Sequence, residues 1–451
     1  MRKIIQYMMM ALIAVVLASC ANDISEESTP TVKSNIRFVV DDFPMFEKPS
    51  TRTIGEEDKG KTAWAVGDEI CVKLESKELG TQTATLKYNG VKFEIQDGNS
   101  LCYLDGEPVT AYAYYAPNRR WRNDGNLGYK DGEHDGTAEF LEATCTVHYG
   151  DDNYIDISFA NVTRNYSRLR IATLPNEQIT VDTEYFTPAG SSDMEQNGNY
   201  TLTSDEKGNA YLYGTFENNS EVTVKYREAA LTTYTFSQAT ESAKSYALDA
   251  TVISANSAEE IKSAIEQKVA DGKTTIRLNL APNAGTDEFM AIREAIKGAA
   301  PNDEGTIELT IIGVETIPEE AFKRMSQLKS VKMPDVKEIK KYAFSECTYL
   351  TVVEAPSLNK LNSGAFNKCN LLSKLTFGPI NYADARYWPI FEDITPNIDL
   401  ILSDYQKEMI KTDDDLYTAN NDIDYALSNK HLNKNFLGHE FKSITCRMKV
   451  E

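Results

Sequence analysis

The sequence predicts a multidomain protein in which all-β sandwich lobes are followed by an α/β repeat solenoid with irregular caps. Residues 36–248 contain short runs of alternating apolar and polar residues, separated by Gly, Asn and Asp, which is the pattern of strands in a sandwich or barrel. Residues 307–378 repeat every 22 residues, which is typical of stacked units. The length of 451 residues also exceeds what one core needs, so two or three domains are expected.

The N-terminus predicts export and lipid attachment. An Arg-Lys pair at residues 2 and 3 precedes an apolar stretch at 8–18, which is too short for a membrane-spanning helix, since that needs about 20 residues. The stretch is therefore expected to be a signal peptide, residues 1–19. Its end, Leu-Ala-Ser-Cys at 17–20, resembles the bacterial lipobox, which implies that Cys20 is lipidated and becomes the first residue. The alternative is an ordinary signal peptide that is cut elsewhere.

Residues 20–35 are polar, acidic and contain Pro, which is typical of an unfolded tether. The acidic residues Asp23, Glu26 and Glu27 resemble the signal that sends lipoproteins of Bacteroides-type bacteria to the outer face of the outer membrane. The alternative is a merely soluble linker. The whole chain carries a formal charge of −21 at pH 7, and so acidic a surface repels polyphosphate. Nucleic acid is therefore not expected as a partner.

The N-terminal half is expected to form two β-sandwich lobes, the first at 36–152 and the second at 153–250. Seven alternating runs are predicted strands: IRFVV at 36–40, EICVKL at 69–74, VTAYAYYA at 109–116, YIDISFA at 154–160, LRIATL at 169–174, NAYLYGTF at 209–216 and EVTVKY at 221–226.

Four stretches in these lobes resemble the fimbrillin-like proteins of the Bacteroides group: STRT at 50–53, TAWAVGDEICVKL at 62–74, AYAYYAP at 111–117 and ISFANVTRNYSRLRI at 157–171. The resemblance implies transthyretin-like lobes behind a lipoprotein signal. It also implies subunits that polymerise by strand donation after cleavage at an Arg, and Arg52 lies in about the right place. The alternative for Arg52 is an ordinary residue of a surface loop.

The C-terminal part, 251–451, contains the regular repeats at about 307–378. Each repeat begins with a short strand, then passes an Ala-Phe step and returns through a Leu, so that stacked repeats bury columns of like residues. The columns include Ala321, Ala343 and Ala365; Phe322, Phe344 and Phe366; Met325, Cys347 and Cys369; and Leu328, Leu350 and Leu372. This pattern resembles the BspA-like leucine-rich repeats of bacterial surface proteins, which read I-x-x-x-A-F-x-x-C-x-x-L. The resemblance implies a leucine-rich-repeat solenoid.

Irregular caps are expected on both sides of the repeats. Helical spacing of apolar residues predicts helices at 257–273 and 286–300, with Ser257 and Glu260 forming a capping box at the first. A strand is predicted between them at 274–280. Further strands are predicted after the repeats, at 397–403 and 441–450.

Six cysteines remain after Cys20, and none forms a C-x-x-C pair, so zinc and thioredoxin-like chemistry lack their spacing. We expect free, buried thiols, because Cys behaves as a small apolar core residue. The alternative is a disulfide between neighbouring coils, joining Cys347 to Cys369.

Motifs for catalysis, metals and cofactors are lacking in the sequence. The four histidines show no metal-ligand spacing, and no G-x-S-x-G, P-loop, H-E-x-x-H or Rossmann fingerprint occurs. We therefore predict no enzyme, no cofactor and no metal site. The stretch DGEHDGTAEFLE at 131–142 is close to a calcium loop but has a Glu at its third place and no flanking helices. A solvated hairpin loop is the favoured interpretation.

The outward-facing strand positions of the repeats form one row, Thr310, Lys332, Glu354 and Thr376, which is the predicted ligand-binding face. The alternative is a merely solvated face. The hypothesis is a non-enzymatic cell-surface lipoprotein, anchored in the outer membrane by its N-terminal lipid, that mediates adhesion or binding to an extracellular protein or glycan through its leucine-rich repeats. The alternatives are a fimbrial tip or anchor component, and an accessory glycan-binding lipoprotein of an outer-membrane uptake system.

Overall fold

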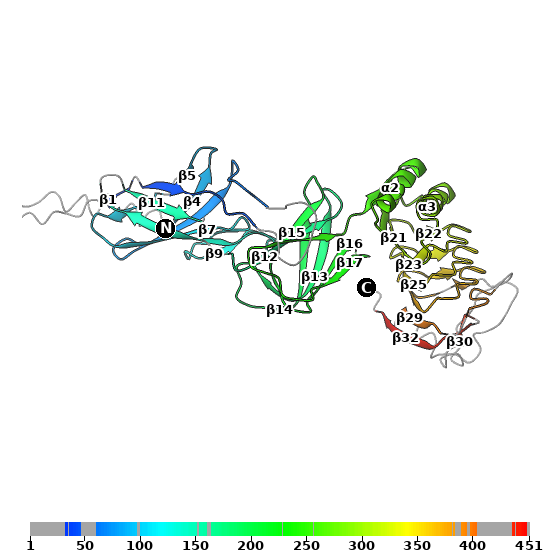
Figure 1. Ribbon diagram of the computed structural model, residues 1–451. Coiled ribbons are helices and arrows are strands. Elements are labelled where there is room, and N and C mark those ends of the chain that lie inside the picture. The colour runs from blue at the N-terminus through cyan, green and yellow to red at the C-terminus, as the bar shows by residue number, and fades with distance from the viewer. Residues whose placement is uncertain are drawn as a thin grey trace, which may run out of the picture. The chain divides into compact units, whose positions relative to one another are not determined.

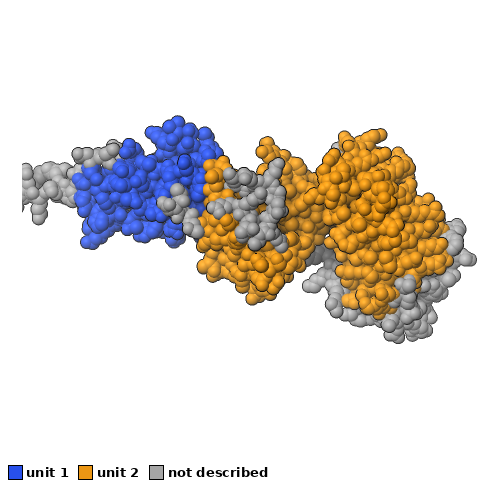
Figure 2. Space-filling view, in the orientation of Figure 1, with its two compact units in different colours: residues 1–44, 63–128, 141–162 blue, residues 45–62, 129–140, 163–451 orange. Residues whose placement is uncertain are grey.

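The computed structural model describes residues 32–34, 36–46, 60–96, 100–150, 153–159, 164–227, 229–255, 257–380, 382–383, 389–394, 397–403, 435–437 and 439–448. The signal peptide, Cys20 and Arg52 lie outside these residues. The described chain is mostly β-strand with two α-helices (Figure 1). It divides into two compact units, residues 1–44, 63–128 and 141–162, and residues 45–62, 129–140 and 163–451 (Figure 2). All seven strands predicted for the N-terminal half are present.

The first unit is built on one seven-stranded sheet. Its order is β2 (Arg37–Val40), β11 (Tyr154–Ser158), β10 (Leu141–His148), β7 (Val109–Tyr115), β3 (Glu69–Ser76), β4 (Gly80–Tyr88) and β5 (Phe93–Ile95). Strand β2 runs parallel to β11, and the other pairs are antiparallel. Strand β10 pairs with β7 through its first three residues and with β11 through the rest, so it turns the corner between two parts of the sheet.

Smaller pairs complete the first unit. Strand β1 (Val32–Lys33) pairs with β6 (Tyr103–Leu104), and β8 (Arg119–Trp121) pairs with β9 (Leu127–Tyr129). Val32 and Lys33, which fall within the predicted tether at 20–35, are therefore part of this fold. Lys33 also forms an ion pair with Asp105, with 3.7 Å between Nζ and Oδ2.

Aromatic rings around Trp64 fill the core of the first unit. The rings of Phe43, Phe93, Tyr115 and Phe159 all lie with centroids between 4.8 and 5.5 Å from that of Trp64. The indole Nε1 donates to the carbonyl oxygen of residue 41 over 2.7 Å, so the polar end of the side chain is also satisfied. Residues 62–74 thus pack a half-buried Trp against the aromatic side chains of this core.

A carboxylate fixes one loop of the same unit. Glu107 Oε1 accepts from Ser76 Oγ and from the backbone N–H of Glu78, each over 2.7 Å, and Oε2 accepts from the N–H of Leu104 over 3.3 Å. The hydrogen bond from the N–H of Glu78, followed by that from Ser76, holds the pKa of Glu107 below its usual range, because both bonds stabilise the ionised form.

The second unit contains another seven-stranded sheet. Its order is β17 (Ala229–Thr235), β16 (Glu221–Tyr226), β13 (Gln178–Pro188), β15 (Asn209–Phe216), β12 (Ser167–Ala172) and β18 (Ser245–Asp249), and β14 (Glu195–Thr203) pairs with β13. Strand β13 pairs with β16 through residues 180–183 and with β15 through residues 186–188. Tyr185, between these stretches, has a left-handed φ of 48°, where β13 changes partner.

Two stretches within the predicted first lobe, 36–152, pack in the second unit instead. Arg164 donates from Nη2 to Glu139 Oε1 over 2.8 Å, and its guanidinium lies 4.0 Å from the centre of the Phe46 ring. Both charged side chains of this ion pair are buried, at 2% and 7% exposure. The carbonyl oxygen of Gly136 accepts from the N–H of Tyr213 over 2.7 Å. Residues 45–46 and 129–140 are therefore structural parts of this lobe.

The repeats form two parallel sheets in the same unit. The larger has the order β19 (Ile253–Ser254), β20 (Thr275–Asn279), β21 (Ile307–Ile312), β23 (Leu328–Lys332), β25 (Val352–Ala355), β27 (Lys374–Phe377), β29 (Asp399–Ser403) and β32 (Ser443–Met448). The smaller consists of β22 (Thr316–Ile317), β24 (Glu338–Ile339), β26 (Lys360–Leu361) and β28 (Tyr382–Ala383). Val331 pairs with Val353, and Val353 with Leu375, which confirms the register that the 22-residue period predicts.

Two helices precede the repeats, as predicted. They are α2 (Ala258–Ala270) and α3 (Thr286–Ala299), and the Ser257 side chain accepts from the N–H of Glu260 at the start of α2. The helices α2 and α3 pack Ile261, Ile265, Phe289 and Ile292 into the core that also contains the repeat columns. A short hairpin of β30 (Asn435–Phe436) and β31 (His439–Glu440) precedes β32.

The predicted phenylalanine column is present and fully buried. The ring centroids of Phe322 and Phe344 are 5.2 Å apart and those of Phe344 and Phe366 are 5.5 Å apart, with interplanar angles of 19° and 7°. All three side chains have 0% exposure. Each ring therefore fills the interior between its neighbours.

The cysteine column is more than apolar packing. Cys347 Sγ donates to the carbonyl oxygen of Phe322, and Cys369 Sγ donates to that of Phe344, each over 3.0 Å. Burial raises the pKa of Cys347 to about 12 and that of Cys369 well above its usual range. The thiols of Cys71, Cys102, Cys145, Cys347 and Cys369 are free, so the predicted free state is confirmed for these five and the alternative disulfide is wrong. The predicted burial is confirmed for Cys71, Cys347 and Cys369, whereas Cys102 and Cys145 are only half-buried.

Candidate functional site

The predicted ligand-binding row exists as one line of neighbours across the larger parallel sheet. Thr310 pairs with Lys332, Lys332 with Glu354, and Glu354 with Thr376. Lys332 Nζ lies 3.5 Å from Glu354 Oε2, and Lys374 Nζ lies 3.8 Å from Glu354 Oε1. One carboxylate thus bridges two ammonium groups, and all three side chains keep between 31% and 46% exposure.

The start of this row is closed to solvent, which the sequence did not predict. Thr310 retains only 5% exposure. Its register partner Arg277 is equally buried, and Arg277 Nε donates to the carbonyl oxygen of Leu231 over 2.6 Å. Thr310 therefore cannot touch a large ligand. The accessible part of the row consists of Lys332, Glu354 and Thr376, with Lys374 beside them.

Ion pairs join successive repeats on other lines of the surface. The measured pairs are Glu308 with Lys329 at 2.8 Å, Glu315 with Lys337 at 2.6 Å, Glu338 with Lys360 at 3.3 Å, and Arg324 with Glu346 at 3.0 Å. Exposed pairs of this kind contribute about 0–1 kcal/mol each to stability. Their main effect is to give the repeats a surface of mixed charge.

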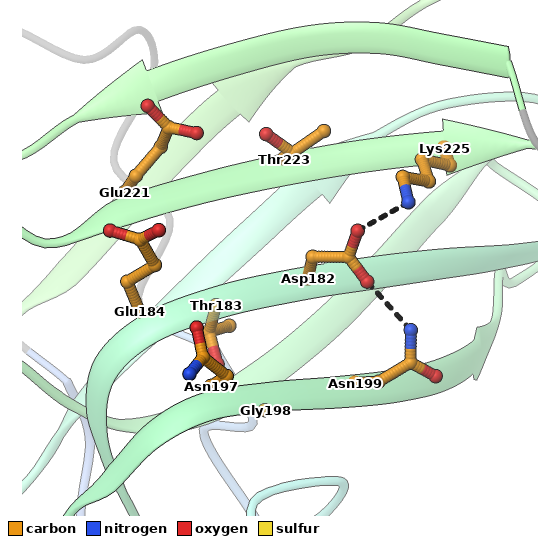
Figure 3. Close-up of a pocket in the computed structure, with 9 residues that line it drawn as sticks. All are labelled: Asp182, Thr183, Glu184, Asn197, Gly198, Asn199, Glu221, Thr223 and Lys225. Atoms are coloured by element: carbon orange, nitrogen blue, oxygen red, sulfur yellow. Dashed lines mark hydrogen bonds and ion pairs between the residues drawn. The ribbon is translucent and has the colours of Figure 1, made fainter. Parts of the chain in front are cut away.

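A second polar surface lies on the outer face of the second lobe, across β14, β13 and β16. It is an open groove of about 490 Å³ (Figure 3). The lining residues are Asp182, Thr183, Glu184, Asn197, Gly198, Asn199, Glu221, Thr223 and Lys225. Carboxylates, amides, hydroxyls and one ammonium group therefore meet in one depression of a sheet face.

One end of the groove is closed by its own hydrogen bonds. Asp182 accepts from Asn199 Nδ2 over 2.6 Å and forms an ion pair with Lys225 Nζ at 2.5 Å, as the dashed lines in Figure 3 show. Thr223 shares a hydrogen bond of 2.9 Å with Thr233 on β17. These groups link four neighbouring strands, β14, β13, β16 and β17, and little of their bonding capacity remains for a ligand.

The other end of the groove keeps its polar groups available. Glu184 and Asn197 are register partners on β13 and β14, and Glu221 begins β16. Within the described chain, no hydrogen bond or ion pair involves the side chains of these three residues. Figure 3 shows the carboxylates of Glu184 and Glu221 at the same end of the groove.

Among the described residues, no group of three or more His, Cys, Asp or Glu side chains is placed to hold a metal ion. In the calcium-like stretch at 131–142, Glu133 instead accepts from Thr137 Oγ1 over 3.2 Å. None of the described helices is long and apolar enough to cross a membrane.

Comparison with known families identifies the repeats. Residues 306–387 match the model of the BspA type leucine rich repeat region, in six copies. The C-terminal part of the chain carries a BspA-type leucine-rich repeat region. The match contains the 307–378 range that the 22-residue period defines. A search of curated proteins finds no match to this chain.

One solved structure similar to this chain is that of a "putative cell adhesion protein" from Bacteroides fragilis NCTC 9343. It shares 10% sequence identity, and the alignment covers 48% of this chain and 92% of that chain, with a TM-score of 0.29. A TM-score this low carries no argument about the fold or the function of this protein.

The sequence predicted the row on the BspA-type repeat region but not the groove. The row follows from the period, since residues 22 apart must become neighbours. The groove depends on which residues of β13, β14 and β16 face each other. The run Asp-Thr-Glu-Tyr at 182–185 does not by itself show which residues of β14 and β16 lie beside Glu184.

Proposed function

We propose that this protein is a cell-surface lipoprotein, anchored in the outer membrane through Cys20, that binds an extracellular protein or glycan through its BspA-type repeat region. The observation that carries the proposal is the accessible line of Lys332, Glu354 and Thr376 on a regular parallel sheet. A face of this kind is rigid, because every strand is hydrogen-bonded to its neighbours. Rigid faces position binding groups better than loops do.

The size of the sheet limits the contact that it can make alone. Eight strands at about 4.8 Å spacing give the sheet a width of about 34 Å. Its strands are at most six residues long, about 20 Å, so the face is smaller than the roughly 800 Å² that a specific interface buries on each partner, and a ligand would also contact surfaces beside the sheet. In this proposal the sheet is the display face of a solenoid, and the transthyretin-like lobes act as the spacer between the lipid anchor and the repeats.

Tryptophan placement argues against a sugar-binding platform in the first lobe, which an accessory glycan-binding role would need. Trp64 is surrounded by other aromatic rings of the core, and Trp121 Nε1 donates to the carbonyl oxygen of Ala84 over 2.9 Å. Both indoles therefore serve the fold. We infer no catalytic activity, no cofactor and no nucleic-acid partner for the protein.

The test is a binding screen followed by matched variants. Purified protein lacking the signal peptide is screened against a glycan array and a panel of extracellular matrix proteins. Any binding found is then measured for the double variant Lys332→Ala and Glu354→Ala. The control is Glu338→Ala with Lys360→Ala, which removes an ion pair of similar length, 3.3 Å, from the smaller sheet.

We expect the Lys332/Glu354 variant to lose at least about tenfold in affinity, equivalent to 1.4 kcal/mol, and the control to lose less than about twofold. Equal losses in both variants, or unchanged binding in the first, would mean that the row is not the binding face.

A further inference from the structure

We propose that the groove on the outer face of β13, β14 and β16 binds an arginine side chain presented by an extended segment of a partner polypeptide. This site is separate from the row on the repeats and does not depend on the function proposed for that row. The inference comes from the charge and the free bonding capacity of the groove.

Two carboxylates in the groove face each other without a cation between them. The register of β13 and β16 pairs Thr183 with Val222, so the next residues along bring Glu184 level with Glu221. Like charges directly opposite on neighbouring strands destabilise a sheet. Among the described residues, neither carboxylate has a hydrogen-bonding or ion-pair partner. A cationic ligand would remove the repulsion and satisfy both groups.

The ammonium group of Lys225 in the groove does not form an ion pair with Glu184 or Glu221. Lys225 is the one cationic side chain among the described residues that line the groove, and its ammonium is committed to Asp182 at 2.5 Å. The lining therefore has three carboxylates and one ammonium, a formal charge of −2. Charge complementarity calls for a cationic occupant at the Glu184 end.

The geometry of the free groups favours a guanidinium over an ammonium. The carboxylates of Glu184 and Glu221 and the amide of Asn197 stand on three adjacent strands. Neighbouring strands are about 4.8 Å apart, which brings these groups close together. A guanidinium carries five N–H donors in a planar fork, whereas an ammonium presents three donors around one atom. The fork can bond to both carboxylates and the amide oxygen together, and such charge-assisted bonds are the stronger kind.

The size of the groove favours a side chain carried on a peptide. Its volume of about 490 Å³ exceeds that of one side chain, and the open shape leaves room for flanking residues. A calcium ion is a poorer fit because it takes six to eight oxygen ligands. The free end of the groove supplies side-chain oxygens from Glu184, Glu221 and Asn197 only.

The experiment measures peptide binding to the full mature chain by fluorescence anisotropy. Three labelled peptides, Gly-Ser-Arg-Ser-Gly, Gly-Ser-Lys-Ser-Gly and Gly-Ser-Gln-Ser-Gly, are compared in low salt and in about 0.15 M salt. The variants are Glu184→Gln and Glu221→Gln. The matched control is Glu206→Gln, which removes an exposed carboxylate of the same lobe outside the groove. Melting curves check that each variant is folded.

We expect the arginine peptide to bind several-fold more tightly than the lysine peptide, and the glutamine peptide not to bind. Each groove variant should weaken arginine binding by about tenfold, and Glu206→Gln by less than about twofold. The Lys332→Ala and Glu354→Ala variant should leave peptide binding unchanged, which separates this test from that of the repeat face.

Three results would overturn the proposal. Equal weakening by Glu206→Gln would reveal general attraction to an acidic surface. No binding of the arginine peptide at about 1 mM would mean that its dissociation constant is weaker than about 1 mM, which corresponds to −4.1 kcal/mol. The groove would then not be an arginine site. Binding of calcium or of a chitosan oligosaccharide that Glu184→Gln abolishes, with arginine binding intact, would assign the groove to that other class.

Discussion

The phenylalanine column allows a quantitative test of the stacked repeats through Phe344→Ala. Phe344 has 0% exposure and lies between two parallel rings, at 5.2 and 5.5 Å. Truncation of a buried Phe typically destabilises a protein by about 3–5 kcal/mol. Because both flanking rings are held by their own repeats, the cavity cannot collapse easily. The lost ring pairs add about 0.5–1.5 kcal/mol each. We therefore expect Phe344→Ala to destabilise the repeats by an amount in the upper half of the range of about 3–5 kcal/mol.

Two buried thiols report on this region alone, which matters because a multidomain chain does not unfold in one step. Cys347 and Cys369 are both at 0% exposure and lie in the columns next to the ring stack. Pulses of iodoacetamide at increasing urea concentrations, read out by mass spectrometry, give the midpoint at which these thiols become accessible. With a slope of about 2 kcal/mol per M, a loss of about 4 kcal/mol lowers this midpoint by about 2 M.

Two controls bracket the expected result. Lys340→Ala changes an exposed side chain of the same repeat and should move the urea midpoint by less than about 0.3 M. Phe344→Leu keeps most of the volume and should have an intermediate effect. If Phe344→Ala behaved like Lys340→Ala, the rings would not be supporting one another and the stacked core would be refuted.

Three further changes test other parts of the structure. Arg164→Met should destabilise the second lobe by about 3–5 kcal/mol in urea denaturation, because it leaves the buried Glu139 carboxylate unpaired, whereas replacing both partners together should cost less. Cys347→Ala should cost about 1–2 kcal/mol, measured with the thiol of Cys369 as the probe, because the hydrogen bond to the preceding repeat is lost. Glu107 has a lowered pKa, so its contribution to stability should be complete above the ordinary carboxyl pKa and disappear as the pH falls through the lowered value. Thermal melts of Glu107→Gln at a series of pH values should lack this loss of stability. A pH profile of Glu107→Gln identical to that of the unchanged protein would contradict the assignment.

The sequence predicted the repeats well because their contacts are periodic. Phe322, Phe344 and Phe366 each meet a copy of themselves, so a spacing of 22 in the sequence becomes a contact in space. The outer row follows by the same logic. The hydrogen bonds of the cysteine thiols were missed, because they join residues 25 apart and involve a backbone oxygen that no residue pattern marks.

Contacts between distant stretches escaped prediction. Thr310 is buried where Arg277 reaches the backbone of Leu231, and no periodic signal connects these residues. The same holds for Glu139, which lies in the predicted first lobe but pairs with Arg164 in the second. The groove depends on strand registers. A shift of one residue between β13 and β16 would move Glu184 away from Glu221.

The uniform spacing of the repeats also separates what the protein recognises from what holds it together. Removing residues 343–364 would bring Phe366 onto Phe322 and Leu375 beside Val331, so the shortened interior would rebuild the contacts of the longer one. The exterior would change, since Lys332 would then stand next to Thr376 without the bridging carboxylate of Glu354. Gain or loss of whole repeats can therefore alter the surface that meets a ligand, while each buried side chain still contacts the equivalent residue of the next repeat.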